Sequence, residues 1–237
     1  MSHGTTVTKL SELASDQWGL LTRRQAEEAG VSPATLQRLS DKAVLERVAW
    51  GVYRLTGAPE PDHMRLRAAW LQLAPETPAW ERKPEQGVVS HRSAAAMFEL
   101  GHLPADRHEF ILPIRRQVRR PDVRLHRGQL RPGERTILGG LPVTWPARTA
   151  ADLLADREDP QAVAQVVSDA LRKKNEWAGN FASALSTQAG QLGLRRGDGL
   201  AALSWLLNLT GDPQAAQWME QARSRPVELT SPLAPEG

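Results

Sequence analysis

The 237-residue chain contains no cysteine, which excludes disulfide bonds, thiol catalysis, zinc–cysteine sites and iron–sulfur clusters. It also lacks long apolar runs: the longest, such as 203–207, fall far short of the ~20 residues that a helix needs to cross a bilayer. The first residues show no basic segment followed by an apolar stretch, so no secretory signal is expected. We therefore expect a cytoplasmic protein that does not span a membrane.

Lysine is scarce as well. The chain has 30 basic residues and a net charge of +3, and nearly all of the basic residues are arginine. Arginine is always charged and its planar fork fits phosphates and guanine edges, so this bias suits a nucleic-acid-binding protein. A GC-rich coding sequence would produce the same bias, so the positions of the charges have to decide between the two explanations.

The first 57 residues predict a compact helical unit that ends in a hairpin. A helix ends before Trp18, and Thr22-Arg-Arg-Gln25 is a capping box that opens a second helix. Ser32-Pro33 opens a third, with serine at the N-cap and proline at the first helical position. The apolar stretches 44–48 and 52–55 then form the hairpin.

The rest of the chain mixes both periodicities. Residues 58–87, rich in proline, form a joint with one helix over 62–73, and residues 88–225 form an α/β region that becomes helical after 159. Short strands are expected at 88–89, 110–112, 123–126 and 141–144, and helices at 93–100 and from Pro146. N-caps are expected at Asp159, Asn180, Asp198 and Asp212, and 226–237 is expected to be a loose tail. The predicted fold class is α+β, a winged helix-turn-helix followed by a mixed α/β domain with a helical C-terminal part.

Residues 22–39 meet the steric demands of a helix-turn-helix. Ala26 allows the two helices to cross closely, Gly30 supplies the positive φ of the turn, and Val31 fills the joint. The second helix would enter the major groove, with Thr35 and Arg38 reading bases. Ser32 and Lys42 would contact the backbone, and Arg47 and Arg54 beside the Trp50-Gly51 tip would follow the minor groove. The candidate DNA-binding residues are Arg23, Arg24, Ser32, Thr35, Arg38, Lys42, Arg47, Trp50 and Arg54. The alternative is a helical scaffold with ordinary solvated arginines, which the near-neutral charge of residues 1–57 favours.

Three stretches resemble a known family: Leu-Leu-Thr-Arg-Arg-Gln-Ala-Glu-Glu-Ala-Gly-Val-Ser at 20–32, Leu-Glu-Arg-Val and Gly-Val-Tyr-Arg-Leu at 45–55, and Ser-His-Arg-Ser-Ala-Ala at 90–95 with the segment 141–153. They resemble the AbiEi family of antitoxins over residues 10–175. The resemblance implies a type IV toxin–antitoxin system for phage defence. A winged helix would repress its own operon at inverted repeats in double-stranded operator DNA. A second domain would counteract a nucleotidyltransferase toxin encoded beside it, without requiring a stable complex. The family does not account for helices 180–224.

A second group of basic residues lies between 113 and 131, where seven arginines face Asp122 alone. We call six of them the arginine belt: Arg115, Arg116, Arg119, Arg120, Arg124 and Arg127. The belt could contact DNA phosphates, dock an acidic surface of a protein partner, or be a solvated loop. The sequence leaves these three uses open.

Enzyme signatures are weak. Pro61-Asp62 with Glu81-Arg82-Lys83 spells a nuclease pattern, but that chemistry needs these groups on adjacent strands around a metal ion, and here they fall at a helix start and in a proline-rich stretch. His91 is expected to cap the helix at 93–100 rather than to act in a triad. No glycine-rich phosphate loop or histidine metal motif occurs. We therefore expect no enzyme, no cofactor and no metal. The alternatives left open are a stand-alone winged-helix regulator and a metal-dependent nuclease.

Overall fold

The computed structural model describes residues 3–224 of the chain, and the expected tail at 226–237 lies outside them. The described residues form two compact units. The first comprises the chain up to residue 89 together with 106–130 and 137–142, and the second comprises 90–105, 131–136 and the chain from 143 onward. The boundaries predicted at residues 57 and 87 stay predictions, which limited proteolysis would test.

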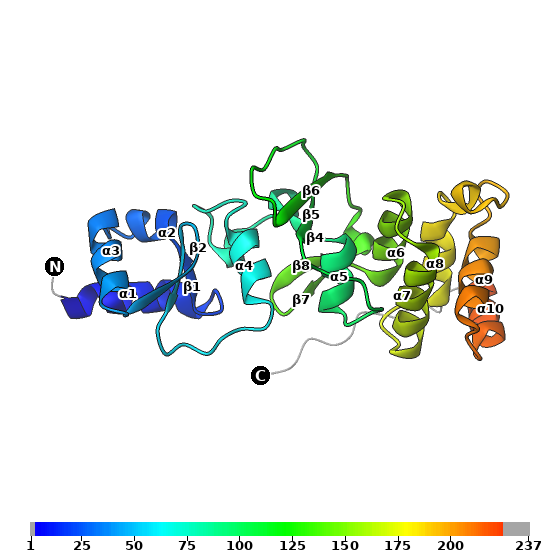
Figure 1. The fold of residues 1–237 in the computed structure, drawn as a ribbon, viewed down its shortest axis with the longest axis horizontal. Coiled ribbons are helices and arrows are strands. Elements are labelled where there is room, and N and C mark those ends of the chain that lie inside the picture. Colours follow the sequence, from blue (N-terminus) through cyan, green and yellow to red (C-terminus); the bar gives the residue numbers. More distant parts are fainter. Residues whose placement is uncertain (1–2, 225–237) are drawn as a thin grey trace. The chain divides into compact units, whose positions relative to one another are not determined.

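The first unit begins with six elements in the order expected of a winged helix (Figure 1): α1 (His3–Ser15), β1 (Leu20–Thr22), α2 (Arg23–Glu28), α3 (Pro33–Asp41), β2 (Leu45–Ala49) and β3 (Val52–Leu55). The strands form an antiparallel sheet in the order β1-β3-β2. Helices and sheet enclose a small apolar core of Leu10, Ala14, Leu21, Ala26, Val31, Leu36, Leu39 and Leu45. Burial of this core fixes how α2 and α3 cross.

The helix starts predicted in this region are confirmed. The Thr22 hydroxyl accepts a hydrogen bond from the Gln25 amide and the Gln25 side chain accepts one from the Thr22 amide, which is a capping box. Ser32 caps α3 by accepting from the Thr35 amide, with Pro33 at the first helical position. Gly30 has a φ of 82°, as the turn between the helices requires.

Two buried glutamines join the helix-turn-helix to a later part of the first unit. The side-chain amides of Gln17 and Gln25 bond each other twice, at 3.0 Å in both directions. Gln17 Oε1 also accepts from the Ala79 amide at 2.9 Å, and Gln25 Nε2 donates to the Thr77 carbonyl at 3.2 Å. Because these polar groups are buried, each needs its partner. The proline-rich stretch is therefore bound to the helix-turn-helix.

An arginine from outside the helix caps the C-terminal end of the next helix, α4 (Met64–Leu71). The Arg82 guanidinium donates to the carbonyls of Trp70, Leu71 and Ala74 and lies 4.3 Å from the centre of the Trp70 ring. The last carbonyls of a helix have no partner within it, so Arg82 serves as a C-terminal cap. Arg82 lies between the short 3-10 helices 79–81 and 84–86.

The second sheet contains β4 (Val88–Val89), β5 (His108–Leu112), β6 (Val123–Arg127), β7 (Arg135–Leu138) and β8 (Leu141–Thr144), in the order β6-β5-β4-β8-β7. The strand β7 was not predicted. It is short, lies at the edge of the sheet and keeps Ile137 67% exposed, so it carries no buried pattern. Gly139 and Gly140 form the turn that joins β7 to β8.

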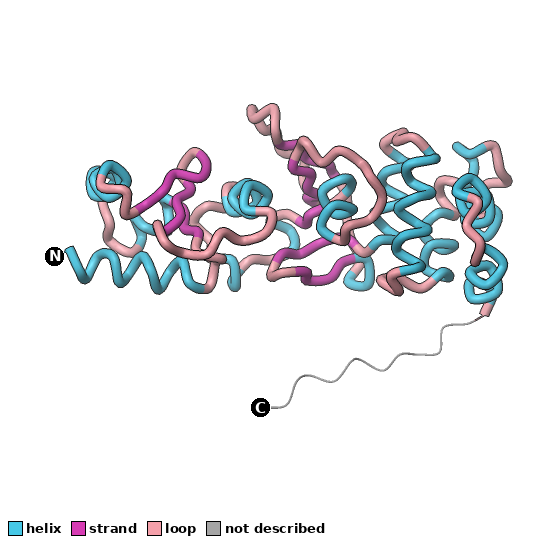
Figure 2. Tube along the Cα trace, turned by 60° about the horizontal axis from the view of Figure 1, so that its bottom comes forward, coloured by secondary structure: helices cyan, strands magenta, loops and turns pink. Residues whose placement is uncertain are grey.

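The second unit is mainly helical: α5 (His91–Met97), α6 (Pro146–Ala155), α7 (Pro160–Arg172), α8 (Ala178–Leu185), α9 (Gly199–Thr210) and α10 (Ala215–Arg223). Figure 2 shows the helices α6 to α10 gathered beside one another, and they share one core that includes Val163, Val167, Phe181, Leu203 and Leu206. Within residues 3–224, no helix combines the length and apolar character that a membrane span requires. The α+β class is confirmed.

Three local predictions in the second unit are wrong. Asn180 lies inside α8 and donates to Glu176, while Trp177 occupies the N-cap. His91 does not cap a helix, because α5 begins at His91 itself and the N-cap is Ser90.

The third concerns the helix after Asp212. The Asp212 carboxylate accepts from the Gln214 amide as expected, but its carbonyl accepts from Ala215 in a tighter turn, so α10 begins only at Ala215. The caps at Asp159 and Asp198 are confirmed.

Candidate nucleic-acid interface

The outer face of α3 carries the residues predicted to read DNA. Leu36 and Leu39 are buried beneath the helix, so Arg38 and the C-cap residue Lys42 point outward and are exposed. Arg38 forms no ion pair with any residue that the structure describes. An unpaired guanidinium on the outer face of such a helix can make a bidentate contact with guanine.

Two hydroxyls lie at the N-terminal end of α3. Ser32 Oγ and Thr35 Oγ1 lie 3.0 Å apart, and Ser32 Oγ also accepts from the Thr35 amide at 3.2 Å. Ser32 is therefore engaged as a cap, and Thr35 is only half exposed. Both keep lone pairs or a hydroxyl proton for one further contact.

The hairpin β2–β3 carries the predicted wing residues. Trp50 at its tip is 77% exposed, which is unusual for a large aromatic side chain. Arg47 lies exposed on β2 opposite Tyr53. Arg54 is different: its guanidinium donates to Glu46 at 2.7 Å and to the Ala58 carbonyl at 3.0 Å. Arg54 therefore stabilises the hairpin and is not poised toward a ligand.

The two arginines that open α2 share one carboxylate. Arg23 Nε lies 2.6 Å from Glu27, and Arg24 Nη1 lies 3.6 Å from the same group. The side chain of Arg24 is 70% exposed. The pair keeps a net positive charge of about one.

The arginine belt extends from the loop between β5 and β6 into β6 itself. The strands β5 and β6 pair in parallel, with His108 opposite Val123, so residues 113–122 must run back along the whole strand. Arg115 and Arg119 are exposed on this loop. Arg116 donates to the Leu73 carbonyl and Arg120 pairs with Asp122, while Arg124 and Arg127 lie on the edge strand.

The second unit contains a polar cavity of about 650 Å³ that sequence reasoning missed. Arg148 lines it, with guanidinium nitrogens 3.1 Å from a carboxylate oxygen of Glu134 and 2.9 Å from one of Asp152. Glu176 also lines it, and burial raises the pKa of its carboxyl group. The lining residues come from three separate segments, so no local spacing could have indicated the cavity.

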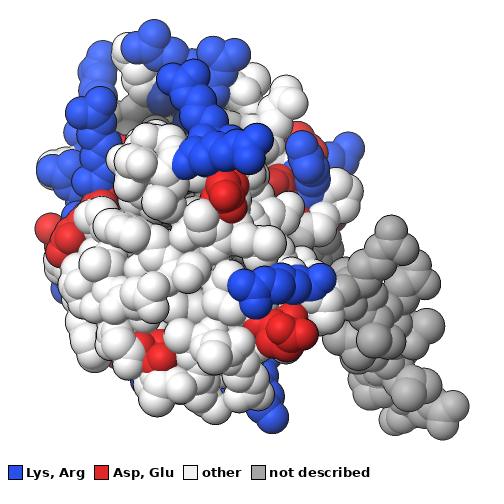
Figure 3. All heavy atoms as spheres, turned by 90° about the vertical axis from the view of Figure 1, so that its right-hand side faces the viewer, with Lys and Arg blue, Asp and Glu red and all other residues white. Residues whose placement is uncertain are grey.

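The C-terminal helices offer a different surface. Figure 3 looks onto the end of the second unit with α9 and α10, and the middle of this face is mostly uncharged. A surface of this kind does not attract phosphate groups.

The nuclease pattern is not assembled. Asp62 precedes α4, Glu81 ends a 3-10 helix and Lys83 is the N-cap of the next one, so none of the three lies on a strand. Within either unit taken by itself, the described residues bring no three imidazole or carboxylate ligand atoms to metal-binding distance.

Comparison with known proteins agrees with the elements of the first unit. Residues 9–56 match the family model described as "Transcriptional regulator, AbiEi antitoxin". No curated protein matches the chain. The matched residues run from the middle of α1 to the end of β3. The resemblance inferred from the sequence is thereby confirmed for this region, and residues 9–56 belong to the AbiEi family of antitoxin transcriptional regulators.

Proposed function

We propose that the chain is an antitoxin and transcriptional autorepressor that binds inverted repeats in its own operator DNA and counteracts a nucleotidyltransferase toxin. The observation that carries the DNA-binding part is the outer face of α3, where Arg38 and Lys42 are exposed beside the hydroxyls of Ser32 and Thr35. The family match supports the regulatory role.

In this proposal α3 enters the major groove. Thr35 and Arg38 contact base edges, while Ser32 and Lys42 at the two ends of the helix contact phosphates. The wing, with Arg47 and Trp50, follows the adjacent minor groove, and Arg24 adds a phosphate contact. Arg23 and Arg54 orient their neighbours through Glu27 and Glu46. The exposed part of the arginine belt extends the contact along the DNA backbone.

Operator recognition is tested with Arg38→Ala. Loss of a bidentate guanine contact should cost about 1–3 kcal/mol, a roughly 5- to 150-fold loss of affinity for the chain's own upstream region, and should relax specificity at one position. Binding is measured by fluorescence anisotropy at fixed salt. The control is Arg223→Ala, an exposed arginine on α10, which should change nothing. Equal binding of the parent chain to operator and random duplex would contradict the repressor role.

The two roles are separated in the full chain with Thr35→Ala/Arg38→Ala. This variant should lose repression of an operator-driven reporter but should still protect cells that express the partner toxin, because neutralisation does not need operator contacts. Reporter output and cell survival are measured in parallel. Loss of protection at unchanged protein level would mean that toxin control acts only through DNA.

A further inference from the structure

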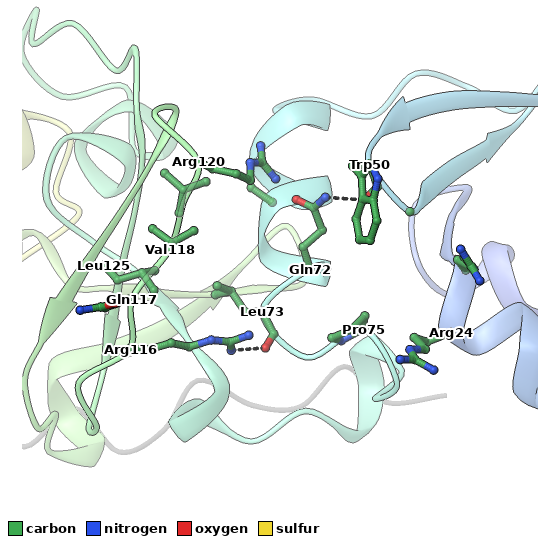
Figure 4. A pocket seen from close by; sticks show the side chains of 14 residues that line it. Arg24, Trp50, Gln72, Leu73, Pro75, Arg116, Gln117, Val118, Arg120 and Leu125 are labelled. Carbon is green, nitrogen blue, oxygen red and sulfur yellow. Dashed lines mark hydrogen bonds between the residues drawn. The ribbon is translucent and has the colours of Figure 1, made fainter.

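The first unit contains a cavity of about 490 Å³, within the range of ~300–1,000 Å³ that small-molecule sites occupy. It lies where the wing tip, the end of α4 and the loop between β5 and β6 face one another (Figure 4). Its apolar wall is formed by Trp50, Leu73, Pro75, Val118, Val123 and Leu125.

Two side chains of the apolar wall are exposed. Trp50 is 77% exposed and Val118 is 37% exposed, although both face the cavity. The Trp50 carbonyl accepts from Gln72 Nε2 at 2.6 Å, which ties the wing tip to the end of α4. An exposed indole beside such a backbone contact offers a flat surface on which another aromatic ring can stack.

All the charged side chains that line the cavity are cationic. Arg23, Arg24, Arg116 and Arg120 line it, and no aspartate or glutamate does. Glu27 compensates one charge of the first two arginines. Asp122 compensates Arg120, whose hydrogen bond lowers the pKa of the Asp122 carboxyl group and keeps it ionised. Arg116 is held by a carbonyl, so about two positive charges remain.

We propose that this cavity binds a nucleoside monophosphate. A nucleobase would stack on Trp50 between the apolar side chains, and a phosphate group, with a charge near −2, would match the two uncompensated arginines. An apolar ligand would leave the cationic side unpaired, and inorganic phosphate would leave the apolar wall exposed to water.

The position of the site gives it a regulatory consequence, which rests on the proposed function. Trp50 and Arg24 are assigned both to this cavity and to operator DNA, so the two ligands compete for the same groups. A nucleotide that occupies the cavity lowers operator affinity, and operator DNA lowers nucleotide affinity by the same factor.

The site is tested by isothermal titration calorimetry on the full chain with AMP, GMP, adenosine and inorganic phosphate. We expect at least one nucleotide to bind about tenfold or more tighter than either adenosine or phosphate. Absence of nucleotide binding at millimolar concentration would overturn the proposal. Phosphate binding as tight as nucleotide binding would reduce the site to an anion patch and overturn it as well.

Two substitutions in the same loop locate the binding. Val118→Asp places a carboxylate on the cavity wall and should abolish nucleotide binding, whereas Ile114→Asp, at a residue that is 66% exposed and outside the cavity, should leave it unchanged. Arg116→Gln should weaken the binding of AMP at least fivefold and leave the binding of adenosine unchanged. Nucleotide binding that survives Val118→Asp would place the ligand elsewhere and refute the assignment.

The coupling is measured separately as operator affinity with and without saturating nucleotide. A decrease of about fivefold or more is expected. If the nucleotide binds but the chain has no operator preference, the site stands and the proposed function fails. If nucleotide and operator DNA both bind, and saturating nucleotide leaves the operator affinity unchanged, the competition is refuted.

Discussion

Reversing two charges of the arginine belt, with Arg115→Glu/Arg119→Glu, is expected to weaken operator binding about a hundredfold at 0.1 M salt. Both side chains are exposed on the loop that returns from β5 to β6. The variant removes two phosphate contacts and places two carboxylates against phosphates, and like charges at an interface cost several kcal/mol. The slope of log affinity against log salt should fall by about two.

The matched control is Arg195→Glu/Arg196→Glu, which makes the same change in net charge at exposed residues of the second unit. It should reduce operator affinity only slightly. If the belt variant binds the operator normally but no longer protects cells from the toxin, the belt is a docking surface for the partner. If both properties are unchanged, the belt is a solvated loop.

Replacing Arg82 by leucine is expected to lower the stability of the first unit by about 3 kcal/mol. The change removes the guanidinium hydrogen bonds to three carbonyls. Those of Trp70 and Ala74 keep a backbone donor, the Leu73 and Thr77 amides, whereas the Leu71 carbonyl loses its donor, and an unsatisfied buried group costs about 1–3 kcal/mol. At this chain length, about 3 kcal/mol corresponds to a decrease of roughly 6–12 °C in the unfolding midpoint.

Differential scanning calorimetry of the full chain measures this effect. Arg115→Leu removes an equally charged but exposed side chain and should change the free energy of unfolding by less than ~0.5 kcal/mol. Arg82→Lys keeps the positive charge but not the planar guanidinium, so its unfolding midpoint should lie between those of the parent and of Arg82→Leu. A leucine variant as stable as the parent would show that α4 does not depend on this cap.

Local chemistry predicted the helix-turn-helix well. The hydroxyl of Thr22, the serine and proline at 32–33 and the glycine at 30 act within four residues of themselves, so their roles could be predicted from spacing alone. The same reasoning failed at Asp212, where the local bond to Gln214 is present but a tighter first turn delays the start of α10. Capping residues predict that a helix begins nearby, but they predict its first residue less reliably.

Features built from distant segments could not be predicted in this way. The glutamine pair at 17 and 25 needs carbonyl and amide partners more than fifty residues away, and Arg82 was considered only as part of a nuclease pattern. The candidate site shows the same limit. Spacing predicted the outward face of α3, but it could not indicate that Arg54 pairs with Glu46 or that Trp50 shares a cavity with Val118.

The first unit is assembled from three separated stretches of chain, the last of which ends at residue 142. A single recombination event within the gene that replaced the helix-turn-helix would therefore divide a folded unit and separate Gln17 and Gln25 from their partners at 77–79. If the chain binds operator DNA as proposed, its operator preference can change more safely by point mutation on the outer face of α3, where the side chains are exposed. Under the proposed function, a new DNA specificity is thus expected to arise by substitution rather than by exchange of domains.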